Sequence, residues 1–150
     1  QAVAAMARIA EYTEREIDYV CRFERSDFRI KNTVDAISHA TCGMAIDIGA
    51  KVIVVTSMSG MTVRMVSRFR APTDIVGMAT NKRVWYKLSL SWGVLPVLSE
   101  QFNSTDVLFY HALRAARDTM HLQPGDNVVM TGGITNGKSG NTNLIKIEAV

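Results

Sequence analysis

The chain has 150 residues, 47% of them hydrophobic and 21% charged, which is the composition of one folded domain with a core of its own. Its net charge of +3 comes from scattered basic residues, without the basic stripe and interleaved aromatic residues of a nucleic-acid-binding protein. No apolar run approaches the roughly 20 residues that a membrane-spanning helix needs. We therefore expect neither nucleic acid nor a membrane as a partner.

The first element that the sequence predicts is one long helix from Val3 to about Arg25, because apolar residues recur there near i, i+3 and i+4 spacing. Its amphipathic, partly acidic start lacks the basic residues and the continuous apolar segment of a signal peptide. The polar stretch 26–32 that follows is expected to connect two structural units. Cys21 and Cys42 have no Cys or His partner at metal-binding spacing, so we expect reduced thiols, no metal site and a cytoplasmic protein.

A second helix is expected from Asn32, as its N-cap, to Ile48, with Gly49 in the left-handed position after its end. Strands and helices then alternate: strand 51–56, helix 61–69, strand 74–79, helix 82–91 ended by Gly93, strand 94–98, a helix that begins at Ser104, and strand 127–131. The strands are apolar throughout and each is followed by a helix. This pattern is typical of a parallel sheet that is covered on both faces.

The last segment breaks this alternation. A polar, glycine-rich loop leads into a final strand, NLIKIEAV, with no helix between them. Without a crossover helix, the strand is expected to return antiparallel along the edge of the sheet. The predicted fold is therefore α/β: a three-layer αβα sandwich whose five-stranded mixed sheet has four parallel strands and a last antiparallel edge strand.

Residues 132–139 read GGITNGKS and match the Walker A pattern G-x-x-x-x-G-K-S. A phosphate-binding loop of that kind needs a helix directly after the Ser, with its N-terminus facing the anion. Here residues 140–143 are Gly, Asn, Thr and Asn, and a strand follows. The sequence therefore disfavours a nucleotide hydrolase, which is kept as an alternative.

A turn of small residues joins the strand 51–56 to its helix: Ser57, Met58, Ser59, Gly60, Met61 and Thr62. The hydroxyl groups could cap the helix by accepting hydrogen bonds from its free N–H groups. Alternatively, the same N–H groups and hydroxyls could hold a phosphate. The carboxyl ends of parallel strands meet at one edge of a sheet, so the loop 137–141 would form a second wall of the same pocket.

Six stretches in the right order resemble the C-terminal domain of pyruvate kinase over nearly the entire chain: 1–14, 35–60, 66–72, 92–98, 122–133 and 139–147. The first, QAVAAMARIAEYTE, is similar to the last helix of that family's catalytic barrel. The closing stretch, SGNTNLIKI, is similar to the family's final strand. The resemblance divides the chain into a helix from the end of the barrel (1–25), a linker (26–32) and a pyruvate kinase C-terminal domain (33–150).

The resemblance implies a regulatory and subunit-interface domain without catalytic residues of its own, and the chain has no paired carboxylates at usable spacing. The barrel, with Mg²⁺ and usually K⁺, would transfer a phosphoryl group from phosphoenolpyruvate to ADP in the parent enzyme. By resemblance, residues 57–62 cradle the phosphate of an effector, and the loop that closes over its sugar contains Ser139, Gly140 and Asn141. The hydroxyl cluster is then expected to cap the helix when empty and to bind phosphate when filled.

The sequence departs from the family at two places that bear on the effector. Many members regulated by fructose bisphosphate have a basic residue where Met61 stands, and the stretch 98–104 lacks the Trp and Arg that grip a second phosphate. Both departures favour a sugar monophosphate or AMP over fructose bisphosphate. Lys138 could supply the missing charge.

The final strand is also expected to form an interface. An edge strand offers unpaired backbone groups, and pairing with its own copy across a twofold axis removes that exposure. We expect a dimer of this chain and a tetramer of the parent enzyme. A free-standing sugar-phosphate-binding or structural domain is the alternative.

Overall fold

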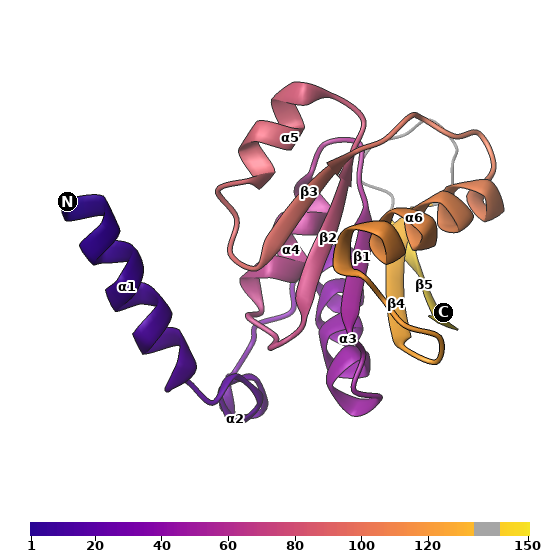
Figure 1. Ribbon diagram of the computed structural model, residues 1–150. Helices are drawn as coiled ribbons and strands as arrows, with labels where there is room; N and C mark the ends of the chain where they lie inside the picture. The colour runs from indigo at the N-terminus through magenta and orange to yellow at the C-terminus, as the bar shows by residue number, and fades with distance from the viewer. Residues whose placement is uncertain (134–141) are drawn as a thin grey trace.

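The computed structural model describes residues 1–133 and 142–150 (Figure 1). Its helices and strands in chain order are α1 (Ala2–Arg15), α2 (Tyr19–Arg25), α3 (Thr33–Asp47), β1 (Val52–Thr56), α4 (Met61–Arg68), β2 (Asp74–Ala79), α5 (Lys82–Leu88), β3 (Val94–Leu98), α6 (Thr105–Met120), β4 (Asn127–Gly133) and β5 (Thr142–Ala149). None of the helices among the described residues is both long and apolar enough to cross a membrane.

The five strands form one sheet in the order β3-β2-β1-β4-β5. The strand β1 pairs in parallel with β2 and β4, β2 pairs in parallel with β3, and β5 pairs antiparallel with β4. The predicted α/β fold, with four parallel strands and a last antiparallel edge strand, is therefore confirmed. All five residues of β1 are buried, as expected for a central strand of a parallel sheet that has helices on both faces.

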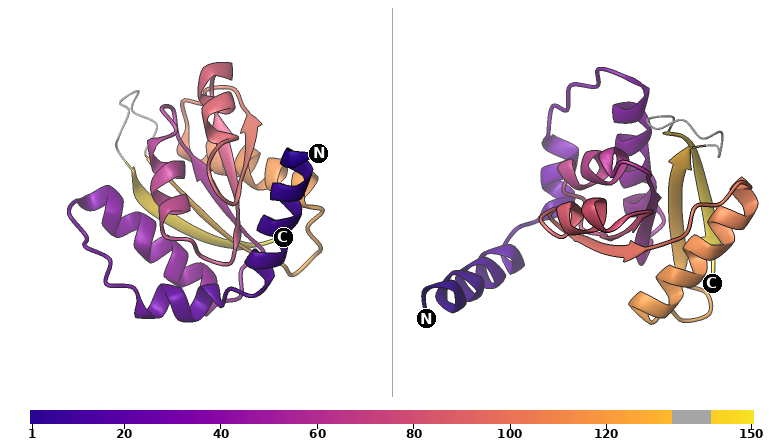
Figure 2. Two further views of the ribbon diagram at one scale, coloured as in Figure 1. Left: turned by 90° about the vertical axis from the view of Figure 1, so that its left-hand side faces the viewer. Right: turned by 90° about the horizontal axis from the view of Figure 1, so that it is seen from above.

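Each face of the sheet has its own core, because successive strand residues point to opposite sides. On one face, strand residues pack against α3, α4 and α5, with a core that includes Cys42, Ala45, Ile53, Val55, Val63, Val66, Phe69, Ile75, Leu88 and Val129. On the other face, strand residues pack against α6, with a core that includes Val52, Val54, Val76, Met78, Phe109, Ala112, Ala116, Val128 and Met130. Figure 2 (right) shows the resulting layers, with α6 on the side opposite the other three helices.

The helix expected from Val3 to Arg25 is instead two helices, α1 and α2. The break has a local cause: the Asp18 backbone is extended, and its carboxylate Oδ1 accepts a hydrogen bond from the Cys21 N–H at 2.9 Å. Asp18 thus starts α2 at a point where the apolar periodicity alone predicts that the first helix continues.

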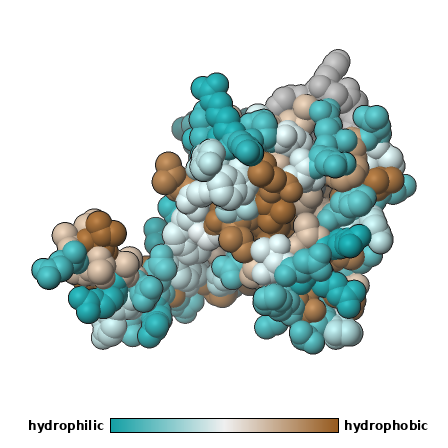
Figure 3. Space-filling model, turned by 45° about the horizontal axis from the view of Figure 1, so that its top comes forward, coloured by the Kyte–Doolittle hydropathy of each residue, from teal (hydrophilic) through white to brown (hydrophobic). Residues whose placement is uncertain are grey.

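The helix α1 extends away from the sandwich and has no buried residue (Figures 1 and 2). Its apolar stripe is exposed and consists of Val3, Met6, Ile9 and Tyr12. Figure 3 shows this apolar surface on the arm at the left, separate from the larger apolar area on the body. Near the end of α1, Trp92 Nε1–H donates to Glu14 Oε1 at 3.1 Å, and the Trp92 ring also lies 5.1 Å from the ring of Tyr19 in α2.

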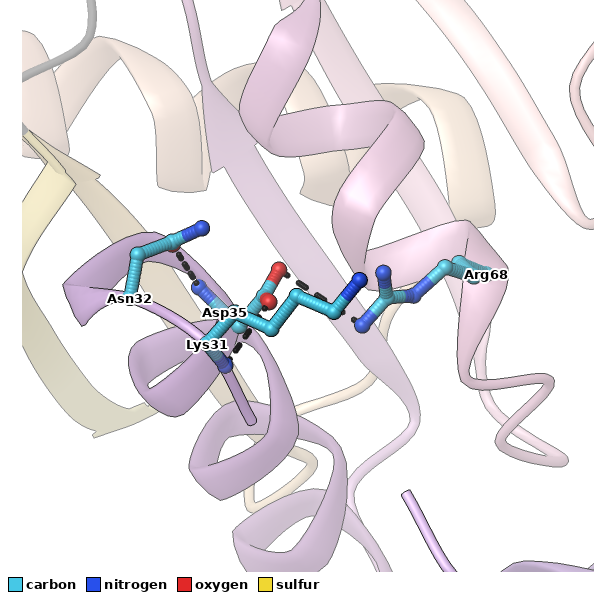
Figure 4. Close-up of polar contacts among 4 residues, drawn as sticks. All are labelled: Lys31, Asn32, Asp35 and Arg68. Atoms are coloured by element: carbon cyan, nitrogen blue, oxygen red, sulfur yellow. Dashed lines mark hydrogen bonds and ion pairs between the residues drawn. The ribbon is translucent and has the colours of Figure 1, made fainter. Parts of the chain in front are cut away.

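The start and the end of α3 agree with the sequence prediction. Asn32 is the N-cap, and its Oδ1 accepts a hydrogen bond from the Asp35 N–H at 2.9 Å (Figure 4). Gly49, just past the helix, has a φ of +58°, the left-handed conformation that glycine adopts at low cost.

The helix α5 is shorter than expected, because it ends at Leu88 rather than near Gly93. After Leu88 the chain turns tightly, with the Ser91 N–H bonded to the Leu88 carbonyl, and this turn brings it back to β3. Trp85 holds the helix against β3, since its Nε1–H donates to the Pro96 carbonyl at 2.8 Å. Gly93 has a φ of +64° but lies in the connection that follows the turn.

Candidate functional site

The turn of small residues lies at the carboxyl end of β1, the edge where α/β sheets bind their ligands. Gly60 has a φ of +75°, and a Cβ there would lie 2.9 Å from Val84 Cγ1 and 3.2 Å from Leu88 Cδ2. Both the conformation and the close approach of α5 therefore favour glycine at this position. The Ser57 N–H bonds to the Met78 carbonyl at 3.3 Å, so the turn begins as a continuation of the sheet.

The expectation that the hydroxyl cluster caps α4 is wrong. The N-cap is Gly60, and no side chain in the described part of the sequence accepts a hydrogen bond from the first turn of α4. The left-handed backbone of Gly60 starts the helix by itself, and the Thr62 hydroxyl is engaged elsewhere. Within residues 1–133 and 142–150, the first N–H groups of α4 thus have no capping side chain, and its first turn contains no acidic residue. This arrangement leaves the positive end of the helix dipole available to an anion.

Four buried threonines hold the turn against the ends of the strands. Thr62 Oγ1 lies 2.5 Å from Thr142 Oγ1, which joins the first turn of α4 to the first residue of β5. Thr56 Oγ1–H donates to the Thr131 carbonyl at 3.4 Å, and Thr131 Oγ1–H donates to the Leu144 carbonyl at 2.9 Å. These hydrogen bonds tie β1, β4, β5 and α4 together at one edge of the sheet.

The six predicted residues of the turn differ in their exposure. Gly60 and Thr62 are buried, and Ser57 is half-buried. Ser59 is exposed, as are Met58 and Met61, at 39% and 48%. The exposed side chains that flank the small residues therefore include two methionines, which carry no charge to pair with a second phosphate.

The second predicted wall, with Lys138, Ser139, Gly140 and Asn141, lies outside the described residues, so the two-walled pocket stays a prediction. The Walker-like motif begins inside β4, since Gly132 and Gly133 are its last two residues. On its other side, residues 142–149 form the strand β5 in place of the helix that a P-loop requires.

A family model described as pyruvate kinase, alpha/beta domain, matches residues 35–148. The chain belongs to the pyruvate kinase family. It is 38% identical to the pyruvate kinase of Clostridium acetobutylicum and 39% identical to pyruvate kinase 2 of Synechocystis, in each case over 100% of this chain. It spans 32% of the first protein and 25% of the second, so it corresponds to about a quarter to a third of these curated relatives.

A solved structure supports the fold of this pyruvate kinase alpha/beta domain. The crystal structure of a pyruvate kinase from Cryptosporidium parvum superimposes on 99% of the chain with a TM-score of 0.84, at 24% sequence identity. The match covers 29% of that structure's chain.

Of the four threonines that hold the site of this pyruvate kinase domain together, the sequence predicted only Thr62 as a site residue. Thr56, Thr131 and Thr142 are buried, although threonine is more often exposed. A signal was present for two of them, since the parallel strands β1 and β4 both carry a threonine at the end of an apolar run, in VVT and VMT. The partner of Thr62, 80 residues away, had no such signal.

Two other side chains that could take part in chemistry, Cys42 and His39, have structural roles in this pyruvate kinase domain. Burial raises the pKa of the Cys42 thiol to about 12, so the group stays protonated near neutral pH. The His39 ring stacks on Phe23 at 4.9 Å and meets Phe28 and Phe69 at their edges. Within 1–133 and 142–150, no three His, Cys, Asp or Glu side chains come together in a way that could hold a metal ion.

Proposed function

We propose that this chain is the regulatory and subunit-interface domain of a pyruvate kinase. The parent enzyme would transfer a phosphoryl group from phosphoenolpyruvate to ADP, giving pyruvate and ATP in glycolysis in the cytoplasm. The family match over 35–148 and the share of the relatives that the chain spans support this proposal. Residues 1–25 would then belong to the end of the catalytic barrel, and 26–32 would link it to the domain.

Catalysis belongs, in this proposal, to a barrel outside the 150 residues. Mg²⁺ and usually K⁺ would serve the chemistry of that barrel. We therefore expect the 150-residue chain alone to be inactive with phosphoenolpyruvate and ADP.

The observation that carries the regulatory role is the N-terminus of α4 behind the turn 57–62, which no side chain of the described residues caps. A helix N-terminus favours an anion by about 0.3–1 kcal/mol at the surface and by up to roughly 2 kcal/mol when partly buried. A micromolar dissociation constant corresponds to about −8 kcal/mol, so several further hydrogen bonds are needed. The hydroxyls of Ser57, Ser59 and Thr62 would supply some of them, and Lys138, Ser139, Gly140 and Asn141 would supply others from the loop.

The effector is proposed to carry one phosphate, as a sugar monophosphate or AMP does. The support is the uncharged pair Met58 and Met61, both exposed beside the turn. A second phosphate would gain no ion pair from either side chain. The binding free energy per phosphate group is therefore expected to be smaller for fructose 1,6-bisphosphate than for a monophosphate.

The interface is proposed to form at β5, the antiparallel edge strand of the sheet. Ile147 is 47% exposed there, and Lys146 Nζ lies 2.7 Å from Glu148 Oε2 in the same strand. Antiparallel pairing of two copies, centred on Ile147, would set Lys146 opposite Glu148 of the second copy. That register would create two opposite-charge pairs across the twofold axis.

The test of the effector site is a calorimetric titration of the chain with ribose 5-phosphate, AMP and fructose 1,6-bisphosphate. Saturable binding of a monophosphate is expected, and Ser59→Asp is expected to abolish it by placing a carboxylate where the phosphate would lie. Ser91→Asp adds the same charge just before β3, at the opposite edge of the sheet, and is expected to leave binding intact. No binding of any of these ligands would contradict the proposal.

A further inference from the structure

The hydroxyl pair formed by Thr62 and Thr142 connects two segments that are 80 residues apart in the sequence. Their Oγ1 atoms are 2.5 Å apart, and the residues are only 4% and 5% exposed. Among the described residues, neither hydroxyl makes another hydrogen bond. The pair is therefore a buried contact whose two members depend on each other.

The direction of this hydrogen bond is open, unlike that of its neighbours. Thr56 and Thr131 donate to backbone carbonyls, which can only accept, so the direction of those bonds is set. Between two hydroxyls, either oxygen can donate. Whichever one accepts keeps a proton that is free to donate elsewhere.

A phosphate at the turn would select one of the two directions. Phosphate oxygens accept hydrogen bonds, so they can accept one from Thr62 only when the Thr62 hydroxyl proton is free to point toward them. That state requires Thr142 to donate to Thr62. A hydroxyl that accepts one hydrogen bond also becomes a stronger donor in the next, because successive bonds polarise one another.

We propose that Thr142 is a positioning residue of the phosphate site: its hydroxyl donates to Thr62 and thereby commits the Thr62 hydroxyl to donate to the phosphate. This inference rests on the proposed effector function and adds a residue that does not itself touch the ligand. The backbone of Thr142 is held by its pairing with Gly133 of β4. Thr142 is also the first residue of β5, so the phosphate turn and the edge strand share one hydrogen bond.

The experiment compares three variants of the 150-residue chain, titrated calorimetrically with ribose 5-phosphate and with inorganic phosphate. Thr142→Val removes the donor at nearly constant shape and is expected to raise the dissociation constant about three- to tenfold, the effect of one neutral hydrogen bond. Thr142→Ser keeps the hydroxyl and is expected to restore the original value. Thr41→Val is the matched control, because Thr41 is also buried but donates to the Ile37 carbonyl within α3.

A double-substitution cycle separates positioning from a general loss of stability. If Thr142 acts through Thr62, the chain with both Thr62→Val and Thr142→Val binds no more weakly than the chain with Thr62→Val alone. Melting temperatures are measured for every variant, and Thr142→Ala takes the place of Thr142→Val if the valine variant does not fold.

The outcomes distinguish this inference from the function on which it rests. Unchanged affinity in Thr142→Val, or additive effects in the cycle, would overturn the positioning role and leave the effector site standing. Absence of binding by the unsubstituted chain would overturn the effector site and this inference together.

Discussion

Arg68 Nη2 lies 3.5 Å from Asp35 Oδ1, so an ion pair joins the last residue of α4 to the first turn of α3 (Figure 4). The two partners are unequally exposed: the Asp35 side chain is 4% exposed and the Arg68 side chain 44%. The other carboxylate oxygen, Asp35 Oδ2, accepts a hydrogen bond from the Lys31 N–H at 3.2 Å. Asp35 is thus a buried acceptor that holds the linker, α3 and α4 together.

Asp35→Ala is expected to lower the free energy of unfolding by about 1–3 kcal/mol, because it leaves the Lys31 N–H without its acceptor and Arg68 without its ion pair. Urea denaturation followed by circular dichroism measures the change. Asp47→Ala, at the exposed end of the same helix, is the control and is expected to change the free energy by about 0.5 kcal/mol or less. Equal losses in the two variants would show that Asp35 has no special role.

Two glycine-to-alanine substitutions are expected to have opposite effects on stability. At Gly132 in β4, a Cβ would lie 2.0 Å from Thr56 Oγ1, so Gly132→Ala should cost about 1–3 kcal/mol through overpacking beside the turn. At Gly43 in α3, the nearest atom would be Phe23 Cε1 at 4.0 Å, so Gly43→Ala should stabilise the helix by about 0.5–1 kcal/mol. Thermal melts of both variants check the signs. A stabilising Gly132→Ala would contradict the close packing of β1 and β4 at the site.

The buried thiol of Cys42 is expected to make stability fall at alkaline pH. Burial raises its pKa from the ordinary 9.0 to about 12, so above pH 9 the unfolded chain loses a proton that the folded chain keeps. The stabilising contribution is therefore complete below pH 9 and is lost as the pH rises toward 12. The free energy of unfolding should fall less between about pH 8 and about pH 10 in Cys42→Ala than in the unsubstituted chain. The difference in the free energy of unfolding between the two chains at neutral pH gives the packing cost of the substitution by itself. If the free energy of unfolding falls equally steeply with pH in both chains, Cys42 is not the group responsible.

The proposed interface at β5 makes a prediction about charge. Lys146→Glu would set like charges opposite each other across the twofold axis and should weaken the dimer by about tenfold. Combining it with Glu148→Lys restores opposite charges in the same register and should recover the dimer. Sedimentation equilibrium measures the dissociation constants of the unsubstituted chain and both variants. If the unsubstituted chain is a monomer at high micromolar concentration, the interface proposal fails.

Much of the fold could be predicted because its signals lie within a few residues of one another. The cap at Asn32, the left-handed Gly49 and the buried run of β1 are local features, and each agrees with the structure. The antiparallel β5 followed from the missing crossover helix, which is a constraint on chain length rather than on packing. The family could likewise be inferred from six short stretches in order.

The predictions from the sequence were wrong or incomplete where two local signals compete or where the partner of a residue is distant in the chain. At Asp18 a side-chain cap competes with helical periodicity, and the cap begins a second helix after the first has ended at Arg15. At the turn, serines and threonine suggested a side-chain cap, but the left-handed Gly60 starts α4 instead.

The sequence by itself determined the element order from α3 to β5, the mixed sheet and the family, since these depend on periodicity, caps and connection lengths. Only the tertiary structure decided that Thr62 turns to Thr142 and that Asp35 pairs with Arg68. A hydroxyl or carboxylate binds whichever partner the packed strands and helices bring within about 3 Å of it. That choice is made by segments far apart in the chain, and no local pattern encodes it.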